Sequence, residues 1–373
     1  MTEPHKPKYQ QIVSDLQRAI TSGEYKEGQR LPSEADLVKR FSTSRLTVQR
    51  ALKELQHQAL IERRAGSGTY VRRNERGDQF VFGLLIPGLG ETEIFEPICQ
   101  GMARAGRAGG HALLWGDTTH ATSDSESDRE QRTRDLCEYY LERRVTGIFF
   151  APLELTQAMD CVNQWVVDTL TEARIPVVLL DRDIYRYPRR CAFDLVGIDN
   201  RRAGFLMTEH LLRHGCKRAL FVARPLSAYT VDTRIAGFHD AIQAFQVANV
   251  HGQVHIGDPD DVDSLRTVFE HFRPDGIVCA NDLTAARLMR SLEQIGLRVP
   301  QDLRIVGMDD VKYAGLLGVP LTTLHQPCRE IGETAVRAML ERIANPNLPT
   351  RDVLLECKLM VRRSCGTHRV EDN

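Results

Sequence analysis

Hydrophobic residues recur at two different spacings along the 373-residue chain, and this difference divides it into two parts. Near the N-terminus they recur every three or four positions over three short segments, which predicts amphipathic helices. The apolar faces comprise Tyr9, Ile12, Val13, Leu16 and Ile20 in the first segment, Leu37, Val38 and Phe41 in the second, and Val48, Leu52 and Leu55 in the third. From Phe80 onward, short apolar runs instead alternate with helical stretches.

Residues that cap helices indicate where the second and third helices begin. Ser33 has the chemistry of an N-cap, and Asp36 three positions later gives a pattern like a capping box. Ser44 precedes the third helix in the same way. Because only a short turn at Ser42 and Thr43 separates the two helices, the segment predicts a helix-turn-helix.

Two short strands are expected after these helices. Residues 60–64 and 69–73 flank the sequence Ala65-Gly66-Ser67-Gly68, and a glycine turn between two such runs is typical of a β-hairpin. A hairpin in this place would be the wing of a winged helix. We therefore assign residues 1–74 to a winged helix-turn-helix head and residues 75–80 to a polar linker.

The longer second part predicts an α/β body with parallel sheets, because strands and helices alternate. About 290 residues can hold two such sheets facing a cleft, and ligands bind at the carboxyl ends of parallel strands. The expected strands are Val81–Pro87, Ala112–Trp115, Gly147–Ala151, Val177–Leu180, Ala219–Ala223, Gly276–Ala280 and Ile305–Met308. The expected helices are Glu96–Ala108, Glu130–Arg143, Arg201–His214, Arg234–Phe245 and Thr284–Gly296.

Composition argues against several classes of protein. Hydrophobic residues make up 42% of the chain and charged residues 27%, which is typical of a soluble globular protein. No apolar run approaches the roughly 20 residues that a membrane span needs, and no apolar segment of a secretory signal is visible. The nine cysteines form no CxxC pair, so we expect a cytoplasmic location with neither a disulfide framework nor a zinc site.

The net charge of −1 conceals an uneven distribution. Residues 1–76 carry 15 basic and 9 acidic side chains, whereas the remainder carries 34 basic and 41 acidic ones, so the head is suited to a polyanion. The polar face of the third helix presents Ser44, Arg45, Thr47 and Gln49, where a recognition helix meets base edges in the major groove. Arginine can pair with guanine and glutamine with adenine. We therefore expect the head to bind double-stranded DNA.

Residues 8–73 resemble the winged helix of the GntR family of bacterial regulators. The resemblance implies DNA contacts by Arg45, Thr47 and the wing tip Gly66-Ser67-Gly68, with Ser44 and Gln49 beside them. Ala35 stands where many members have an arginine that contacts the DNA backbone, and Gln49 stands where some have a second arginine that reads a base. The operator sequence of this protein therefore cannot be taken from any one member. The matching motifs are Tyr9-Gln10-Gln11-Ile12, Gly28-Gln29-Arg30-Leu31-Pro32-Ser33-Glu34, Ser44-Arg45-Leu46-Thr47-Val48, Ala51-Leu52, Leu60-Ile61 and Gly66-Ser67-Gly68-Thr69-Tyr70-Val71.

Most of residues 81–363 resembles the effector domain of the LacI/GalR regulators, which is similar to periplasmic sugar-binding proteins. The matching motifs are Val196-Gly197-Ile198-Asp199-Asn200, Arg234-Ile235-Ala236-Gly237-Phe238, Ala280-Asn281-Asp282-Leu283-Thr284-Ala285, Val306-Gly307-Met308-Asp309-Asp310 and Pro320-Leu321-Thr322-Thr323-Leu324. The resemblance implies an effector-binding and dimerisation domain over residues 81–365. Its N-terminal lobe would span about 81–198 and 324–345 and its C-terminal lobe about 199–323 and 346–365, with a tail at 366–373.

The combination of these two parts resembles chimeric regulators of the arabinose-repressor type. It implies a homodimer on pseudo-palindromic DNA and a small effector, usually a sugar, that closes the lobes. The residues that this resemblance directs at the effector are Asp181, Arg234, Asn281 and Asp309. Phe95 and Glu93 follow the first strand of the body, so we expect them to line the N-terminal lobe. Carboxylates accept hydrogen bonds, arginine donates them, asparagine does both, and an aromatic ring packs against C–H groups, which together suit a polyol. For Asp199 we expect a structural role as a helix cap.

The sequence contains no motif that would support an enzyme. It lacks GxGxxG, GxxxxGK[ST], GxSxG and HExxH. We therefore expect a ligand-responsive transcriptional regulator without a cofactor, a metal or a membrane partner. A repressor of carbohydrate-utilisation genes, released by its sugar, is the favoured hypothesis. A regulator of a nucleoside, a purine or another metabolite stays open, as does an activator or a repressor that needs a corepressor.

Overall fold

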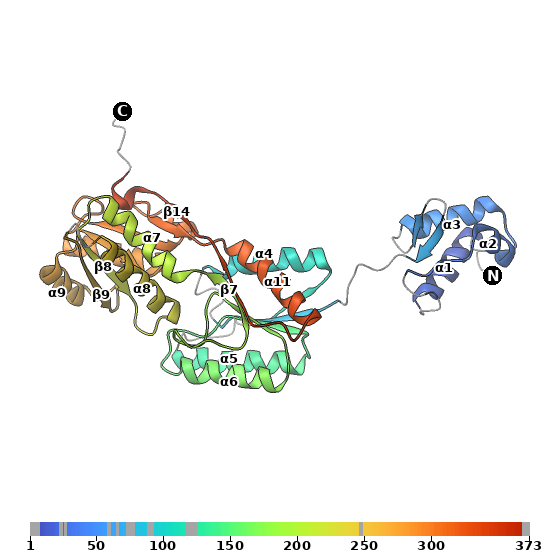
Figure 1. Cartoon of the computed structure of the whole chain (residues 1–373), viewed down its shortest axis with the longest axis horizontal. Coiled ribbons are helices and arrows are strands. Elements are labelled where there is room, and N and C mark those ends of the chain that lie inside the picture. The colour runs from blue at the N-terminus through green and yellow to red at the C-terminus, as the bar shows by residue number, and fades with distance from the viewer. Residues whose placement is uncertain are drawn as a thin grey trace, which may run out of the picture. The chain divides into compact units, whose positions relative to one another are not determined.

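The computed structural model of the chain forms two compact units, Met1–Asp78 and Gln79–Asn373. It describes residues 8–21, 25, 28–57, 61–64, 67–71, 79–87, 93–116, 125–245 and 249–367. The boundary between the units lies inside the segment 75–80 that the sequence assigns to a linker. The first unit is the head, and the second is the body (Figure 1). Across these described ranges, no helix has both the length and the apolar character needed to cross a bilayer.

The head has the helices and hairpin of a winged helix. The apolar faces predicted from the sequence meet in its core, where Ile12, Leu16, Leu37, Val48 and Leu52 are all buried. Such short helices are marginal alone, so their stability comes from this packing. The elements are α1 (Lys8–Thr21), α2 (Glu34–Phe41), α3 (Arg45–His57), β1 (Ile61–Arg64) and β2 (Gly68–Val71).

All three predicted helix caps are present. Ser33 Oγ accepts a hydrogen bond from Asp36 N at 3.2 Å, and the Asp36 carboxylate accepts one from Ser33 N at 3.1 Å, which completes the capping box. Ser44 Oγ accepts from Thr47 N at 3.2 Å where α3 begins. In the body, Asp199 accepts from the backbone N–H three positions later at 2.9 Å. These caps satisfy amide groups that a helix leaves unpaired at its start.

The first lobe of the body contains a six-stranded parallel sheet in the order β13-β7-β6-β5-β3-β4. Helices cover both of its faces, which is why β5 and β6 are buried throughout. The strands are β3 (Val81–Leu85), β4 (Ala112–Trp115), β5 (Gly147–Phe150), β6 (Val177–Leu180), β7 (Asp194–Ile198) and β13 (Asp352–Leu355). One face carries α4 (Phe95–Gly109) and α11 (Cys328–Ala344), and the other α5 (Glu126–Glu142) and α6 (Met159–Glu172), as Figure 1 shows.

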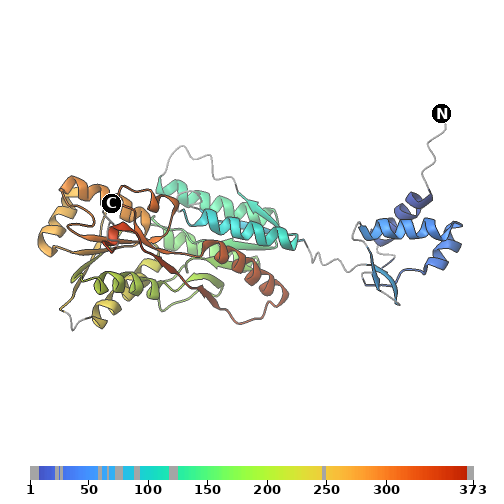
Figure 2. The same cartoon turned by 90° about the horizontal axis from the view of Figure 1, so that it is seen from above.

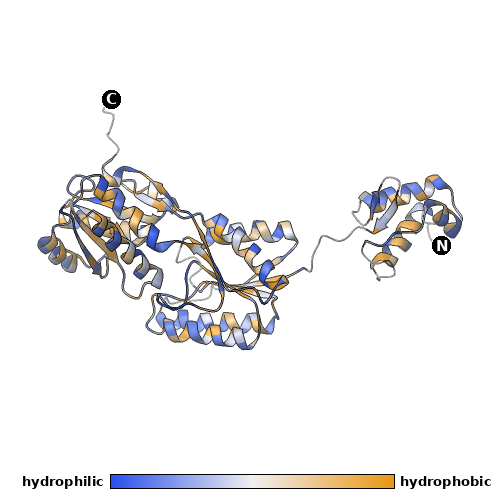
Figure 3. Cartoon of the chain, in the orientation of Figure 1, coloured by the Kyte–Doolittle hydropathy of each residue, from blue (hydrophilic) through white to orange (hydrophobic). Residues whose placement is uncertain are grey.

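The second lobe repeats this arrangement in the order β14-β12-β11-β10-β8-β9, with β14 antiparallel to β12 and the other pairs parallel. Figure 2 gives a second view of both lobes, and Figure 3 shows hydrophobic residues concentrated on their strands. The strands are β8 (Arg218–Ala223), β9 (His251–Ile256), β10 (Gly276–Cys279), β11 (Arg304–Asp309), β12 (Thr322–His325) and β14 (Lys358–Met360). The helices are α7 (Asn200–Arg213) and α8 (Tyr229–Ala244) on one face, and α9 (Val262–Phe272) and α10 (Asp282–Ile295) on the other.

The chain passes between the lobes three times, after β7, after β12 and after β13. The structure corrects two boundaries expected from the sequence. Residues 346–365 do not all belong to the C-terminal lobe, because β13 pairs with β7 in the first lobe, with Val353 opposite Val196. The return to the first lobe also comes later than residue 324, because β12 ends at His325 in the second lobe. The position of an edge strand such as β13 depends on which distant strand it pairs with, and local sequence patterns do not reveal that partner.

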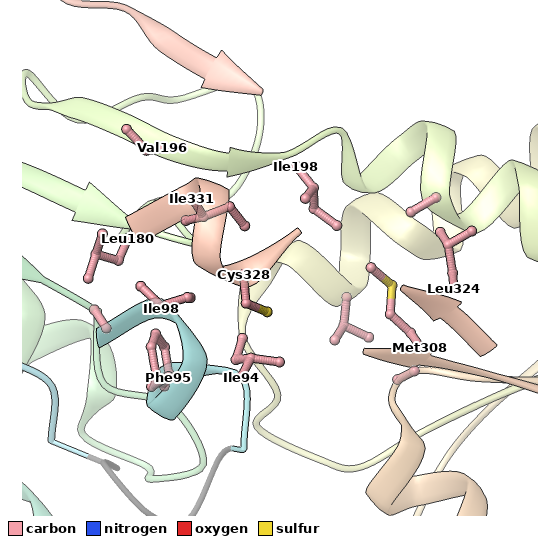
Figure 4. Close-up of a cluster of buried hydrophobic side chains, with 14 of the residues drawn as sticks. Ile94, Phe95, Ile98, Leu180, Val196, Ile198, Met308, Leu324, Cys328 and Ile331 are labelled. Carbon is pink, nitrogen blue, oxygen red and sulfur yellow. The ribbon is translucent and has the colours of Figure 1, made fainter. Parts of the chain in front are cut away.

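Buried side chains continue from one lobe into the other at these crossings. A single hydrophobic cluster includes residues from both sheets and from the segments between them. Because the cluster is continuous, the crossings are packed rather than loosely connected. Figure 4 labels Ile94, Phe95, Ile98, Leu180, Val196, Ile198, Met308, Leu324, Cys328 and Ile331 of this cluster.

Glycines allow one pair of helices in each lobe to approach closely. A Cβ atom on Gly204 of α7 would lie 1.9 Å from Arg234 O of α8, and one on Gly237 of α8 would lie 1.8 Å from a carbonyl oxygen of α7. In the first lobe, a Cβ atom added to Gly101 of α4 or to Gly332 of α11 would lie 2.1 Å from a carbonyl oxygen of the opposite helix. Glycine therefore sets the spacing of α7 and α8, and with it the position of Arg234.

Gly204→Ala should lower the free energy of unfolding by about 1–3 kcal/mol, because the added methyl group forces α7 and α8 apart. Urea-induced unfolding of the full-length protein measures the change. Gly318→Ala is the matched control, since no heavy atom outside its chain neighbours lies within 4 Å of its Cβ position. Equal unfolding midpoints for the two variants would contradict the close approach of the helices.

Candidate functional site

The first turn of α3 presents the side chains expected to read DNA. Arg45 begins the helix, and its side chain is 77% exposed. Ser44 Oγ and Thr47 Oγ1 lie 2.8 Å apart and share a hydrogen bond. Leu46 is 78% exposed, although the sequence analysis gave it no role. An exposed apolar side chain beside polar ones suits a DNA base edge, where thymine offers a methyl group.

Glu34 ties several of these side chains together. Its Oε2 accepts hydrogen bonds from Arg45 Nε and Gln49 Nε2, both at 3.1 Å, and its Oε1 accepts one from Arg63 Nη2 of the wing at 2.6 Å. The Gln49 hydrogen bond, aided by Arg45 and Arg63, holds the pKa of Glu34 below its usual value. Exposed ion pairs contribute only about 0–1 kcal/mol. DNA can therefore replace Glu34 as the partner of Arg45 at little energetic cost.

Strand β2 of the wing also pairs with residues 29–31. Leu31 N donates to Thr69 O, and Val71 N donates to Gln29 O, both at 2.9 Å. Ser67 Oγ is 2.7 Å from the Tyr70 hydroxyl, so the predicted contact residue also braces the turn. Gly68 has a φ of +126°, and a Cβ atom there would lie 2.7 Å from Arg30 Nε. Glycine at this position therefore lets the Arg30 side chain cross the wing. Gly66, the remaining predicted contact, lies outside the described residues.

In the body, a cleft of about 420 Å³ lies between the carboxyl ends of the two sheets. This volume is typical of sites that hold a small molecule. In each sheet the strand order reverses beside the first strand, β3 or β8, which is where open α/β sheets bind ligands. The structure brings together all six residues that the sequence directed at an effector: Asp181, Arg234, Asn281, Asp309, Phe95 and Glu93 line the cleft.

Two of the carboxylates stand on unusual backbone. Asp181 follows β6 with a φ of +68°, and Asp309 ends β11 with a φ of +114°. Residues other than glycine seldom adopt positive φ, and such conformations cost about 1–3 kcal/mol each. Both turns bring a carboxylate to the same cleft. Strain that persists at two strand ends of one cavity is typical of a ligand site.

Buried polar atoms in the cleft lack hydrogen-bond partners within the described part of the chain. They include Asp181 Oδ1 and Gln326 Oε1, in side chains that are 4% and 1% exposed. Gln326 Nε2 donates to Asp309 Oδ1 at 2.7 Å. Burial raises the pKa of Asp181, and burial together with a neighbouring acid raises that of Asp309. Because an unpaired buried polar group costs about 1–3 kcal/mol, a ligand that pairs with these atoms would be bound favourably.

The donors of the cleft are held in fixed orientations. Arg234 Nε donates to Asn200 Oδ1 at 2.8 Å, and its Nη1 donates to Ala280 O at 2.7 Å. Asn281 Oδ1 caps α10 by accepting from Thr284 N at 2.8 Å. Asn281 therefore caps a helix and lines the cleft at the same time. A fixed donor loses less conformational entropy on binding a ligand than a mobile one.

An ion pair that the sequence did not indicate lies in the same cleft. Arg182 pairs with Glu154, and its guanidinium lies 5.4 Å from the centre of the Phe95 ring. Burial alone would lower the pKa of Arg182, but the carboxylates of Glu154 and Asp181 outweigh burial and raise it. Arg182 lies two residues after the end of β6, and the rule that ligands bind at the carboxyl ends of parallel strands therefore points to it as well.

Hydrogen bonds join the lobes at one side of the cleft. Leu155 N of the first lobe donates to Leu226 O of the second at 2.8 Å, and Glu154 accepts from Ala228 N at 3.0 Å. The Tyr229 hydroxyl donates to the carboxylate of Asp160. Any movement that separates the lobes has to break these bonds. Because these bonds lie beside the cleft, a ligand in the cleft can change how readily the two lobes separate.

A second buried acid lies near Asp309. Asp282, the first residue of α10, is fully buried and accepts hydrogen bonds from Thr323 Oγ1 at 2.6 Å and Val311 N at 3.0 Å. Burial raises its pKa from 3.8 to about 7. Between these values the folded protein holds a proton that the unfolded chain releases. The contribution of Asp282 to stability is therefore fully present below about pH 4 and is lost as the pH rises through about 7.

The Tm should consequently fall between pH 5 and pH 8, and Asp282→Asn should reduce this fall by at least about 3 °C, because the amide resembles the neutral acid. Thermal unfolding at both pH values measures the difference. Asp263→Asn is the matched control, since the Asp263 side chain is 92% exposed. A wild-type pH profile in Asp282→Asn would show that this carboxyl is ionised throughout the range.

Comparison with known proteins gives the same division of the chain. Residues 8–71 match the gntR family of bacterial regulatory proteins, and residues 208–365 match the periplasmic binding protein-like domain. The chain is 28% identical to the arabinose metabolism transcriptional repressor of Geobacillus stearothermophilus, over 98% of this chain and 99% of that one. It is 26% identical to the ribose operon repressor of Escherichia coli K12, over 87% and 92% of the two chains.

Among solved structures, the LacI family transcriptional regulator from Enterococcus faecium with bound ribose is similar to the body. The TM-score is 0.60 at 23% identity, over 76% of this chain and 98% of that chain. At this identity the likeness shows the fold alone. The protein therefore joins a helix-turn-helix domain of the gntR family of bacterial regulatory proteins to a two-lobed periplasmic binding protein-like domain, the composition of a ligand-responsive transcriptional regulator.

Proposed function

We propose that the protein is a repressor of carbohydrate-utilisation genes, and that a sugar or sugar derivative bound in the cleft releases it from operator DNA. One observation carries the proposal: buried polar atoms, Asp181 Oδ1 and Gln326 Oε1, stand without partners in a cleft of small-molecule size. Groups of this kind require a polar ligand rather than an apolar one. The exposed first turn of α3 supplies the DNA-binding output.

A sugar suits this cleft because every hydroxyl both donates and accepts hydrogen bonds. Asp181 and Asp309 supply acceptors, Arg234 supplies donors, and Phe95 offers part of an aromatic surface for C–H groups. The relatives named for arabinose and ribose support the same class of effector. A thermal-shift screen of pentoses, hexoses, polyols and nucleosides identifies it, because a ligand that binds only the folded protein raises the Tm.

The effector can change DNA affinity only if it binds two arrangements of the body with different affinities. Three crossings and the bonds at Leu155 and Glu154 link the lobes. A sugar that contacts Asp181 of one lobe and Asp309 of the other favours the arrangement in which both are within reach. We propose that this closed arrangement has the lower affinity for DNA.

We also propose that the protein works in the cytoplasm as a homodimer, with each head on one half of a pseudo-palindromic operator. The proposed operator DNA supports this location. Relatives that are transcriptional repressors support a binding protein rather than an enzyme. A two-fold symmetric dimer requires two inverted half-sites in the DNA, which a footprint reveals directly.

Arg45→Ala should weaken operator binding by about 1–3 kcal/mol per half-site and relax the base preference at one position, because a bidentate contact to guanine is lost. Footprinting on randomised sites measures both effects and displays the two half-sites. Lys53→Ala removes a charge from the same helix and should instead weaken binding to all sequences and reduce its salt dependence. If Arg45→Ala keeps wild-type affinity and preference, α3 does not read the bases as proposed.

Asp309→Asn should weaken effector binding about 10- to 100-fold and leave operator affinity unchanged. The amide replaces one acceptor by a donor, so a ligand hydroxyl loses its partner, at a cost of about 1–3 kcal/mol. Asparagine tolerates positive φ better than most residues, so the backbone is preserved. Calorimetry with the sugar found by the screen, and operator binding with and without it, measure the two properties.

Asp310→Asn is the matched control for this variant. Asp310 has a φ of +58° but bonds to Arg362 and His325 and is not among the residues that line the cleft. It should keep wild-type effector affinity. A folded Asp309→Asn protein that leaves the operator at the wild-type sugar concentration would refute the proposed role of Asp309.

A further inference from the structure

Three arginines line the cleft in addition to Arg182 and Arg234. Arg129 comes from α5 of the first lobe, Arg224 directly follows β8 of the second, and Arg287 lies on α10. None of the three was expected from the sequence. Arg287 is 36% exposed, whereas Arg182 is only 7% exposed, so this second group lies nearer to the mouth of the cleft.

Arg224 and Arg287 make few contacts with carboxylates. Arg224 makes no side-chain hydrogen bond or ion pair with any residue that the structure describes. The carboxylate nearest to Arg287 is that of Asp260, at 3.8 Å, and Asp260 is bound more closely by Arg290, at 2.8 Å. Arg129 Nη2 donates to the backbone oxygen of Leu155 at 3.3 Å. The contacts of Arg224 and Arg287 leave positive charge at the mouth of the cleft.

The inner arginines differ in this respect. Arg182 is paired with Glu154, and Arg234 lies near the carboxylates of Asp181 and Asp309. The cleft therefore has an inner part, where carboxylates and arginines are paired or lie close together, and an outer part with Arg129, Arg224 and Arg287, where Glu93 is the exposed carboxylate of the lining. Burial lowers the pKa of Arg224, and the charges of Arg287 and Arg129 lower it further, against the opposing effect of the carboxylates of Asp258 and Glu154. Like charges that repel one another in a partly desolvated cleft favour binding of an anion.

We propose that the effector is a polyhydroxylated molecule with an anionic group, a carboxylate or a phosphate, and that Arg129, Arg224 and Arg287 bind this group. The inference rests on the proposed function and narrows its ligand class. The hydroxyls would meet Asp181 and Asp309 while the anion meets the arginines. Arginine suits both anions, because its planar fork can donate two parallel hydrogen bonds to carboxylate or phosphate oxygens.

The positions of these arginines also suggest how the anion acts on the lobes. Arg129 belongs to the first lobe, and Arg224 and Arg287 belong to the second. An anion between them replaces repulsion across the cleft by attraction to both sides. It therefore binds the closed arrangement more tightly than an open one, as an effector must in order to shift the equilibrium between them.

Calorimetry on the full-length protein tests the proposal with matched probes. Each set consists of a neutral sugar, its aldonate and its phosphate ester: D-ribose, L-arabinose and D-glucose, each with its two anionic counterparts. We expect at least one anionic form to bind about tenfold or more tightly than its neutral parent, as one charged hydrogen bond is sufficient for this difference. The aldonate and the phosphate ester distinguish the two sources of negative charge.

Arg224→Gln should bring the affinity ratio between the anionic and the neutral form close to one, and Arg287→Gln, on a separate element, should reduce it in the same direction. Arg290→Gln is the matched control, because Arg290 lies on the same helix as Arg287, bonds to Asp260 and is not among the residues that line the cleft. It should keep the wild-type ratio. Melting temperatures of all three variants verify that they are folded.

Two outcomes would overturn the inference, and they differ in what they say of the proposed function. If a neutral sugar binds at least as tightly as both of its anionic forms in every set, the effector is a neutral sugar and only the anionic group is wrong. If none of the nine compounds binds, the proposal of a sugar effector fails as well. An unchanged ratio in both Arg224→Gln and Arg287→Gln would show that other groups bind the anion.

Discussion

The carboxyl ends of two parallel sheets meet at one cleft, and the polar chemistry of the body depends on this geometry. All strands of a parallel sheet end at the same edge, so residues far apart in the sequence come together there. Asp181 follows β6, Arg224 follows β8, Asn281 follows β10 and Asp309 ends β11. Since each strand is held by two neighbours, these side chains are positioned by backbone hydrogen bonds rather than by mobile loops.

Placing so many charged groups in one cavity has an energetic cost that the fold offsets locally. Glu154 and Arg182 neutralise one another, Gln326 donates to Asp309, and Asp282 retains its proton near neutral pH. Buried charges without partners would otherwise destabilise the lobes by several kcal/mol each. The unpaired acceptors in the inner part of the cleft and the arginines in its outer part are not offset inside the protein. These groups therefore indicate the chemistry of a complementary ligand.

The polar side chains of the head are held differently from those of the cleft. The side chains expected to read DNA are exposed or half-buried, and Arg45 and Gln49 are held by the single carboxylate of Glu34. Contacts at the surface are weak, so they orient the side chains without competing strongly with DNA. Donors such as Arg234 in the cleft are thus already fixed, whereas the side chains on α3 are held by weak contacts and can exchange partners. This difference suits a body that has to respond to a small ligand and a head that has to leave its operator.

The sequence by itself determined the features that depend on neighbouring residues: the apolar helix faces, the caps at Ser33 and Ser44, and strands such as 112–115 and 177–180. Four of the six cleft residues came from a resemblance to a known family, and Phe95 and Glu93 came from their position after the first strand of the body. Only the tertiary structure decided the lobe of β13, the partners of Glu34 and the second group of arginines around Arg224. Those features depend on contacts between segments distant in the chain, and no local spacing or propensity encodes which distant segments will meet.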